Sequence, residues 1–460
     1  MSANTVVQCT MTMLGHSTRI KAQLFEHQKA ILRELEKRRY FAVFAEQGTS
    51  KTLPMLIHAL RLYKAGAIRH ALVVCPNSVK GSWSRDIQQF FNPLEQRLFE
   101  KFLTVTTYDL IWRRPELDRE WDMMVLDESH FIKNRTSNRF RGQIKKVGGR
   151  RQRVTNGIQQ ISRRSKFRYI MTGTPIGNSR WEEIWAQFDF MNPDIFGPYS
   201  HFEKRYCIIG QYYRPVAYKN LDELKAIIAQ HSIWIRKADC MDLPEKLPPE
   251  RLTLDLQEKK LYKEMLQNYI AELDIEAKNP LARMVKLRQL CSGHIKDETG
   301  KVHKVKCAKP AALDEFLENW DKKLVIFAEF EESIADICRV LDKRQIQYVT
   351  LDGRQRDKQV WKRFQSETDI QVIVCQYRSA SAGIDLYAAD TMIFYEPTLS
   401  SQTFEQACDR IHRAGQKEKC SYILFETAGT VEVKIWDALM RHRDFNETEF
   451  RDYIQSFKKE

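Results

Sequence analysis

Two separate stretches of the chain alternate short apolar runs with segments of helical length, and this pattern constrains the fold more than any other feature. Short apolar runs separated by helices are typical of strands in a parallel sheet that is covered on both faces. The first set of runs is 40–45, 71–75, 103–108, 123–127 and 168–172. The second set is 323–330, 348–351, 372–375, 391–395 and 421–425. The sequence therefore predicts an α/β protein with two lobes, each built on a parallel sheet.

The two predicted lobes are joined by a segment of different composition. Residues 242–249 (DLPEKLPP) hold three prolines, which end helices and inner strands, so we expect an extended connector there. Helix-rich sequence follows it, and an amphipathic helix with a charged tail should close the chain. We expect a first lobe with a helical protrusion at 1–235, a linker with a short second protrusion at 236–307, a second lobe at 308–430, and a C-terminal brace helix and tail at 431–460.

The composition of the 460 residues is that of a globular protein with a basic balance. The formal net charge of +14 favours a polyanionic partner, usually nucleic acid, although a generic basic protein would show the same excess. None of the ten cysteines forms a CxxC pair, so neither a zinc site nor a disulfide scaffold is expected. No apolar stretch is long enough to cross a membrane, and we expect no membrane partner.

The segment AEQGTSKT at 45–52 follows a predicted strand and opens a predicted helix. Backbone N–H groups and the helix dipole at such a position can bind phosphate. Lys51 would reach the β- and γ-phosphates of a nucleotide, and the Thr52 hydroxyl would bind Mg²⁺. Ala45 and Ser50 break the strict G-x-x-x-x-G-K-[ST] pattern, so taken alone the segment is better explained as a plain loop that ends in a lysine.

An acidic run, Asp127-Glu128-Ser129-His130, ends the apolar run 123–126. A carboxylate at a strand tip can hold Mg²⁺, and the adjacent carboxylate can orient and deprotonate an attacking water. Phosphoryl transfer depends mainly on positioning and charge neutralisation, so this small set suffices. The alternative is a solvated acidic turn. A phosphate-loop candidate upstream favours the catalytic interpretation.

Two further motifs could complete such a site. The tetrapeptide TGTP at 172–175 ends a predicted strand and offers two hydroxyls in a compact turn, although an ordinary Gly-Pro turn would look the same. In the segment 406–416 (QACDRIHRAGQ), Arg410 and Arg413 are three residues apart, which would place them on one face of a helix. Two guanidiniums could stabilise charge on a transferred phosphate, whereas the alternative is a salt-bridged surface helix.

Residues 133–168 hold thirteen Lys and Arg and no Asp or Glu. Such a block repels itself and is not expected to form its own core. Lys and Arg gain free energy by releasing counterions from a nucleic-acid backbone, so we predict a phosphate-contacting loop that includes Arg150, Arg151 and Arg153. The alternative is a solvated loop that contacts nothing.

These elements, in this order, resemble the superfamily-two helicases of the DEAD/DEAH-like group, and within it the Swi/Snf-type ATP-dependent DNA translocases in a compact form. The resemblance covers about residues 20–440 and implies two recA-like lobes with helical protrusions between them. It is carried by 24–30 (LFEHQKA), 73–83 (VVCPNSVKGSW), 105–110 (VTTYDL), 172–178 (TGTPIGN), 192–207 (NPDIFGPYSHFEKRYC), 287–294 (LRQLCSGH), 379–385 (SASAGID) and 406–416.

The resemblance assigns a role to each matching residue, with ATP and Mg²⁺ as cofactors. The catalytic residues would be Asp127, Glu128, Arg410 and Arg413, and the Mg²⁺ ligands Thr52 and Asp127. ATP would bind to Gln28, Gly48, Thr49, Ser50, Lys51 and Thr52. Coupling residues would be His130, Thr172, Gly173, Thr174, Gly383, Asp385 and Gln406. Nucleic acid would contact Lys80, Trp83, Thr106, Ser379, Arg150, Arg151 and Arg153.

The chain also departs from the family pattern. Ser50 stands where relatives usually have glycine and adds a Cβ near the phosphates, so we expect turnover to survive at a reduced rate. The second-lobe motif has only Gly383 where relatives often have more glycines. No reader, zinc-finger or nuclease module is visible. A compact core of this kind predicts a monomer in the cytoplasm of a prokaryote or of a virus-infected cell, with the nucleus as an alternative compartment.

The function that this resemblance implies is ATP hydrolysis coupled to translocation on double-stranded DNA, which would remodel DNA or protein–DNA complexes. Binding would be independent of sequence, because phosphate contacts carry no base information. An unknown protein partner could recruit the motor. One alternative is a strand-separating helicase or RNA-dependent ATPase, which a wedge-like hairpin in the basic loop would favour. The other is a degenerate ATPase that acts as a nucleic-acid-binding adaptor, for which Ser50 is the only support.

Overall fold

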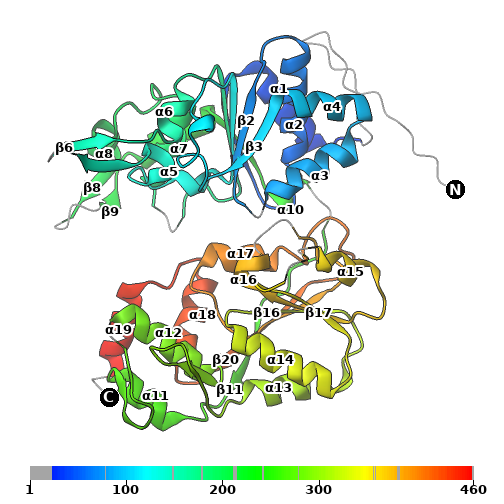
Figure 1. Ribbon diagram of the computed structural model, residues 1–460, viewed down its shortest axis with the longest axis vertical. Helices are drawn as coiled ribbons and strands as arrows, with labels where there is room; N and C mark the ends of the chain where they lie inside the picture. Colours follow the sequence, from blue (N-terminus) through cyan, green and yellow to red (C-terminus); the bar gives the residue numbers. More distant parts are fainter. Residues whose placement is uncertain are drawn as a thin grey trace. The chain divides into compact units, whose positions relative to one another are not determined.

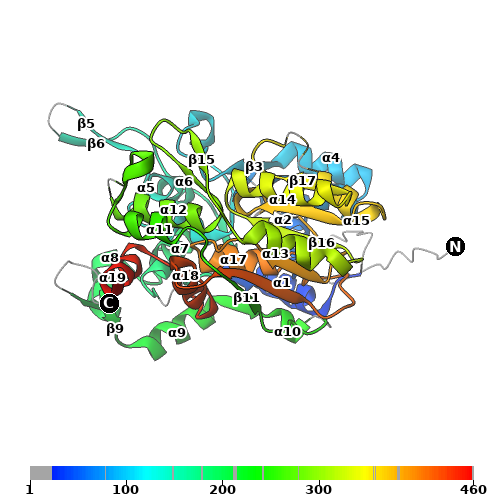
Figure 2. The ribbon, with the colours of Figure 1, turned by 90° about the horizontal axis from the view of Figure 1, so that it is seen from below.

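The computed structural model describes residues 23–77, 79–147, 150–177, 180–210, 215–240, 243–277, 279–355, 357, 359–380 and 384–457. The chain forms two compact units, Met1–Asp242 and Leu243–Glu460. Each unit is built on a six-stranded sheet with helices on both faces (Figures 1 and 2). The prediction of an α/β protein with two parallel-sheet lobes is confirmed. In the described ranges, no helix combines the length and apolar character that crossing a membrane requires.

The sheet of the first unit has the strand order β10-β1-β7-β4-β2-β3, and every pairing in it is parallel. Its strands are β1 (Tyr40–Ala45), β2 (Ala71–Cys75), β3 (Leu103–Thr107), β4 (Met123–Asp127), β7 (Phe167–Thr172) and β10 (Ser232–Ile235). All five predicted strands are present within one residue of their predicted ends. The sixth, β10, was not predicted, because it lies at the sheet edge and Trp234 in it is 52% exposed.

Alternate residues of β1 explain why the strand runs are continuously apolar. Phe41 and Val43 pack into one buried cluster, which α1 to α4 cover. Ala42 and Phe44 pack into a second cluster on the opposite face, under α5 to α9 (Figures 1 and 2). The helices of this unit are α1 (Glu26–Lys37), α2 (Thr52–Lys64), α3 (Lys80–Phe90), α4 (Pro93–Phe102), α5 (Asn138–Arg141), α6 (Ile158–Ser162), α7 (Glu183–Met191), α8 (Tyr199–Tyr206), α9 (Leu221–Gln230) and α10 (Lys237–Cys240).

Two antiparallel hairpins extend the first unit beyond its layers. The basic block folds partly into a hairpin of β5 (Ile144–Val147) and β6 (Arg150–Arg153), which projects from the unit in Figure 2. The described side chains of β6 are exposed along its whole length. The other hairpin, β8 (Cys207–Ile209) with β9 (Pro215–Tyr218), lies in the predicted helical protrusion.

The sheet of the second unit has the order β11-β20-β19-β16-β18-β17 and is again entirely parallel. Its strands are β11 (Glu250–Leu254), β16 (Leu324–Ala328), β17 (Tyr348–Leu351), β18 (Val372–Gln376), β19 (Thr391–Phe394) and β20 (Ser421–Thr427). The edge strand β11 was not predicted. It follows the proline-rich connector directly and pairs with β20, so part of the predicted linker region belongs to the second sheet.

The helices of the second unit are α11 (Lys259–Leu266), α12 (Pro280–Cys291), α13 (Lys309–Phe316), α14 (Glu331–Lys343), α15 (Val360–Ser366), α16 (Tyr377–Ala380), α17 (Ser401–Cys408), α18 (Val431–Met440) and α19 (Glu447–Phe457). The end of the chain therefore forms two helices where one helix and a tail were predicted. The hydroxyls of Tyr262 and Tyr453 lie 2.9 Å apart, which ties α19 to α11. The Tyr262 hydroxyl also accepts the backbone N–H of Val431 at 2.7 Å.

Candidate functional site

The predicted phosphate loop connects β1 to α2 in the first unit. Gly48 has a φ of 85° and Ser50 a φ of 53°, so both lie in the left-handed region. Gly48 occupies that region without steric cost, whereas Ser50 carries a Cβ there. Lys51 and Thr52 follow immediately at the start of α2. The loop therefore has the predicted position, between a buried strand and a helix N-terminus.

Helix α1 holds the loop through two carbonyl groups. His27 Nε2 lies 2.9 Å from the carbonyl oxygen of Thr49, and the Gln28 amide donates to the carbonyl oxygen of Ser50 at 3.2 Å. The other end of the Gln28 side chain accepts the backbone N–H of Phe25 at 3.0 Å. Gln28 is 2% exposed, so its amide is committed to the loop and to the start of its own helix.

Lys51 joins the loop to the acidic run. Its ammonium donates to Glu128 Oε1 at 3.2 Å and to the carbonyl oxygen of Ala45 at 3.3 Å. Both side chains of the Lys51–Glu128 pair are 10% exposed. A charge pair with so little water is costly to form unless further hydrogen bonds support it. The structure thus brings the two strongest sequence motifs into direct contact.

Glu128 supplies those further hydrogen bonds. Its backbone has a φ of 55°, in the left-handed region. Oε2 accepts the Thr172 hydroxyl at 3.1 Å and lies 3.4 Å from His130 Nδ1. Burial by itself raises the pKa of Glu128, but the Lys51 ammonium and the His130 contact outweigh it and hold the pKa below its ordinary value. Glu128 is therefore ionised at neutral pH.

Asp127 differs from its neighbour although the two are adjacent in sequence. It ends β4, is 2% exposed, and accepts the Trp83 indole N–H on Oδ2 at 2.9 Å. Its carbonyl oxygen accepts the Tyr108 hydroxyl at 3.0 Å. Burial raises the pKa of Asp127 to about 6, although Lys51 lowers it in part. Bound positive charge would lower the pKa and stabilise the ionised form further.

The acidic run is also connected to the TGTP segment. The Thr172 hydroxyl lies 3.1 Å from His130 Nδ1 and accepts the backbone N–H of Thr174 at 3.1 Å. A Cβ on Gly173 would lie 3.3 Å from the carbonyl oxygen of Ala45, so glycine allows the segment to pack closely on the phosphate loop. The structure therefore brings together the predicted coupling residues of the first unit.

Sequence reasoning missed the residue that completes this network. Gln187, fully buried on α7, accepts the Ser129 hydroxyl at 2.6 Å and donates to the carbonyl oxygen of Pro175 at 2.6 Å. Gln187 lies on α7 in the helical protrusion, and its side chain links the acidic run to the TGTP segment. The available signal was a polar residue flanked by apolar ones in the segment IWAQF of this helix.

These residues fit Mg²⁺ with a nucleoside triphosphate. Mg²⁺ is commonly held by one or two protein oxygens, phosphates and waters, without an all-protein cage. Accordingly, the described ranges contain no cluster of three or more His, Cys, Asp or Glu side chains that could hold a metal. Asp127 and Thr52 offer the two protein oxygens, and the Lys51 ammonium provides a buried cation for phosphate.

The predicted nucleic-acid contacts divide into two groups. Trp83 is 1% exposed and Thr106 is 4% exposed, so the prediction that they contact nucleic acid directly is wrong. Trp83 packs in the core beneath β2, and the carbonyl oxygen of Thr106 faces Cys75. Lys80, at the start of α3, is exposed. The arginines of β6 (Arg150, Arg151 and Arg153) are exposed as well.

The second unit holds the arginine motif, but not on a helix face. α17 ends at Cys408, and Arg410 and Arg413 lie in the turns that follow. The prediction of one helical face is therefore wrong, because the backbone here forms successive short turns up to Gly415 with a φ of 106°. Both guanidiniums nevertheless reach the carbonyl oxygen of Ile384, at 3.5 Å from Arg410 and 2.9 Å from Arg413.

A charge pair joins two predicted residues of this unit. Arg413 lies 2.7 Å from Asp385 Oδ1, which links the catalytic and coupling assignments. Gln406 is half-buried on α17, and Ser379 is half-buried on α16. Gly383 lies outside the described residues.

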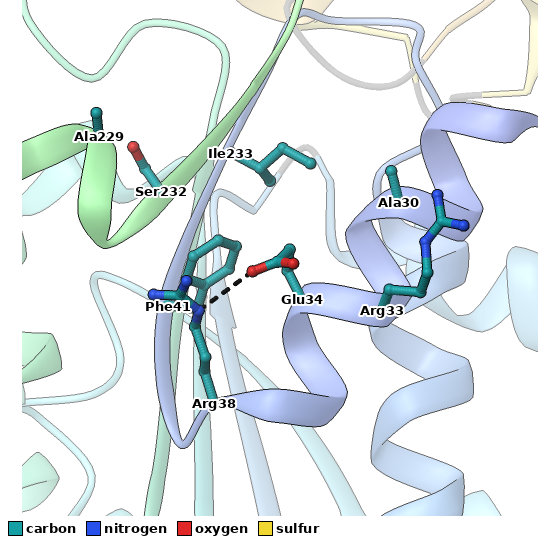
Figure 3. Close-up of a pocket in the computed structure, with 8 residues that line it drawn as sticks. All are labelled: Ala30, Arg33, Glu34, Arg38, Phe41, Ala229, Ser232 and Ile233. Carbon is teal, nitrogen blue, oxygen red and sulfur yellow. Dashed lines mark hydrogen bonds and ion pairs between the residues drawn. The ribbon is translucent and has the colours of Figure 1, made fainter. Parts of the chain in front are cut away.

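A cavity of about 360 Å³ in the first unit is separate from this network (Figure 3). It is lined by Ala30, Arg33, Glu34, Arg38, Phe41, Ala229, Ser232 and Ile233. Arg38 stacks over the Phe41 ring at 5.0 Å and pairs with Glu34 at 3.2 Å. None of the predicted site residues lines this cavity, so it is not the candidate nucleotide site.

Comparison with known families agrees with this site. Residues 31–295 match the SNF2-related domain family, and residues 308–415 match the helicase conserved C-terminal domain. The first match covers more than half of the 460-residue chain, so the chain belongs to the SNF2-related family. The predicted resemblance to the Swi/Snf-type proteins is confirmed.

Individual relatives are distant. The chain is 24% identical to the uncharacterized ATP-dependent helicase MG018 of Mycoplasma genitalium, over 88% of this chain and 40% of that protein. It is 27% identical to a Caenorhabditis elegans homologue of the SWI/SNF-related regulator of chromatin subfamily A-like protein 1, over 92% of this chain and 61% of that protein. The SWI2/SNF2 ATPase core of Sulfolobus solfataricus in complex with dsDNA gives a TM-score of 0.43 at 24% identity, over 95% of this chain and 94% of that one. The chain spans about two-fifths of the length of several curated relatives it matches.

Proposed function

We propose that this chain is a nucleic-acid-dependent ATPase that couples ATP hydrolysis to translocation on double-stranded DNA. The observation that carries the proposal is the buried network in which Lys51 contacts Glu128 and Glu128 contacts Thr172 and His130. These residues come from three motifs of the sequence: the phosphate loop, the acidic run and the TGTP segment. Membership of the SNF2-related family supports the same activity.

The network provides the charges that phosphoryl transfer requires. In the proposed mechanism Lys51 binds the β- and γ-phosphates, and Thr52 and Asp127 hold Mg²⁺. The ion, when bound, neutralises phosphate charge in the transition state. Glu128 orients the attacking water and accepts its proton, and it is ionised for that role. Arg410 and Arg413 supply positive charge to the transferred phosphate, for which Arg413 must exchange its contact with Asp385.

The exposed cations of the first unit support duplex binding. Lys80 at the start of α3 and the three arginines of β6 are free to approach phosphates, and phosphate contacts would make binding sequence-independent. We propose a monomer that remodels DNA or protein–DNA complexes, with recruitment by an unidentified protein partner. The proposed compartment is the cytoplasm of a prokaryote or virus-infected cell, with the nucleus as the alternative.

One observation favours a second candidate function. The basic block contains an antiparallel hairpin, β5–β6, with exposed arginines, and such a hairpin could act as a wedge between strands. A strand-separating helicase or RNA-dependent ATPase is therefore the alternative. The adaptor hypothesis is weaker, because Lys51, Asp127 and Glu128 are all present and Lys51 contacts Glu128.

The test is an ATPase assay with duplex DNA, single-stranded DNA and RNA in parallel, with Lys51→Ala as the inactive control. We expect the strongest stimulation by duplex DNA, together with displacement of a third strand from a triplex and no unwinding of the duplex. Stimulation mainly by single strands or RNA would support the second candidate. Rates no higher than those of Lys51→Ala would leave only the adaptor.

A further inference from the structure

Trp83 makes a contact that the proposed mechanism has not yet used. Its indole N–H donates to Asp127 Oδ2 at 2.9 Å, and the two side chains are 1% and 2% exposed. A neutral donor that reaches a buried carboxylate fixes the position of that carboxylate, because each alternative rotamer would lose the hydrogen bond. The donor lies on α3, whereas the carboxylate ends β4.

The surroundings leave the indole little freedom to move. Trp83 belongs to the buried cluster that includes Cys75 at the end of β2 and Phe91 just beyond α3. Asp127 is also held at its backbone, where its carbonyl oxygen accepts the Tyr108 hydroxyl. Side chain and main chain of Asp127 are thus fixed from two separate segments, which is the support that a metal-binding carboxylate needs.

We propose that Trp83 is a positioning residue that fixes the Asp127 carboxylate for Mg²⁺ in the nucleotide site. The inference rests on the proposed function, because Asp127 is the Mg²⁺ residue of that proposal. Trp83 does not touch the ion or the nucleotide. It acts by keeping one carboxylate oxygen engaged and the side chain in one orientation, which lowers the cost of ordering the site when Mg²⁺ binds.

The chain offers a matched control. Trp121 is also 1% exposed in the first unit, and its indole N–H donates to the carbonyl oxygen of Leu117 at 3.0 Å. Trp83→Phe and Trp121→Phe therefore remove the same atoms and one hydrogen bond each from a buried indole. Only the first removes a contact with Asp127.

The first measurement is Mg²⁺-dependent binding of a fluorescent ADP analogue, followed by anisotropy at increasing Mg²⁺. A hydrogen bond to a charged group contributes enough that we expect Trp83→Phe to raise the Mg²⁺ concentration for half-maximal binding roughly tenfold. Trp121→Phe should leave it unchanged. Nucleotide binding in EDTA should be the same in both variants, which separates a Mg²⁺ effect from general damage.

The second measurement uses the wild-type protein and remains informative if Trp83→Phe does not fold. Tryptophan is labelled with ¹⁵N in the indole ring, and the Trp83 signal is assigned by its absence from the conservative variant Trp83→His, or by elimination from Trp→Phe substitutions at the other tryptophans. Addition of Mg²⁺ with ADP should shift that signal in the wild type and not in Asp127→Asn. An unmoved signal would overturn the inference.

The two hypotheses fail in distinguishable ways. If the wild type shows Mg²⁺-dependent nucleotide binding and Trp83→Phe needs the same Mg²⁺ concentration as Trp121→Phe, only the role of Trp83 is wrong. If the wild type shows no Mg²⁺-dependent binding at all, the nucleotide site itself is wrong, and the role of Trp83 is overturned with it.

Discussion

Ser50→Gly is the substitution that most directly tests the phosphate loop. Ser50 has a φ of 53°, and its side chain is exposed, so the residue carries the cost of a left-handed conformation without a buried contact in return. That conformation costs a residue with a Cβ about 1–2 kcal/mol. Glycine adopts this conformation freely, but it also increases the entropy of the unfolded chain, which lowers the stability of the folded state by about 0.5–1 kcal/mol. The net expectation is a stabilisation of the folded state by about 1 kcal/mol.

The assay compares thermal unfolding of Ser50→Gly with that of Ser50→Ala. The two variants differ only in the Cβ, and both retain the carbonyl oxygen that accepts the Gln28 amide. A difference of about 1 kcal/mol corresponds to about 2–4 °C for a unit of this size. The transition of the first unit is the one that moves when Mg²⁺ and ADP are added, because a ligand stabilises the unit that binds it.

A control lies outside the site. Gln345 is exposed, has a φ of 57°, and is in the second unit, so Gln345→Gly should stabilise that unit without changing ATP hydrolysis. Ser50→Gly should raise kcat/KM for ATP only as far as the Ser50 Cβ crowds the phosphates in the transition state, because strain that is equal in the free and transition states does not change the rate. If Ser50→Ala unfolds at the same temperature as Ser50→Gly or above it, the strain argument is refuted.

Three further predictions concern the charges of the first unit. The pKa of Asp127 is raised from 3.8 to about 6 in the folded protein, so its ionisation costs stability as pH rises from about 4 to 6. Asp127→Asn should therefore gain up to about 3 kcal/mol over the wild type at pH 7 and only about 0.5 kcal/mol at pH 4, measured by urea unfolding without Mg²⁺. Thr172→Val removes a donor to Glu128 and an acceptor for Thr174 and should lower kcat while costing about 1–3 kcal/mol of stability, as a turnover assay with thermal unfolding would show. Replacing Arg150, Arg151 and Arg153 by Gln should reduce the magnitude of the slope of log affinity for duplex DNA against log salt concentration by up to about 3. An unchanged slope would show that the hairpin does not contact the DNA phosphates.

The central strands of both sheets could be predicted because their burial is continuous. β1 and β16 each contribute alternate residues to two cores, so their sequences are apolar at every position and stand out from the rest of the chain. The edge strands lack this signal. β10 exposes Trp234, and β11 alternates exposed with half-buried residues after a proline-rich connector, so neither has the pattern of an inner strand.

The site shows a similar division. Lys51 could be found because it ends a loop between an apolar strand and a helix, and the acidic run because charged residues at the end of an apolar strand are unusual. The structure brings Lys51 and Glu128 within 3.2 Å of each other. Trp83 and Thr106 were misassigned because the sequence places them next to exposed positions such as Lys80 without indicating which way each side chain points. The partner of Trp83 depends on how α3 packs on the sheet, and no local pattern encodes that packing.

The contact between Lys51 and Glu128 gives the proposed mechanism an internal order. While the ammonium pairs with Glu128, it holds the pKa of that carboxyl low, and a carboxylate of low pKa is a poor base. In the proposed mechanism Lys51 leaves Glu128 for the nucleotide phosphates. Glu128 then loses its strongest opposing charge while it stays buried beside Thr172, and both conditions favour a higher pKa. The base would therefore gain strength only when a nucleotide is bound, which would limit idle activation of water in the empty site.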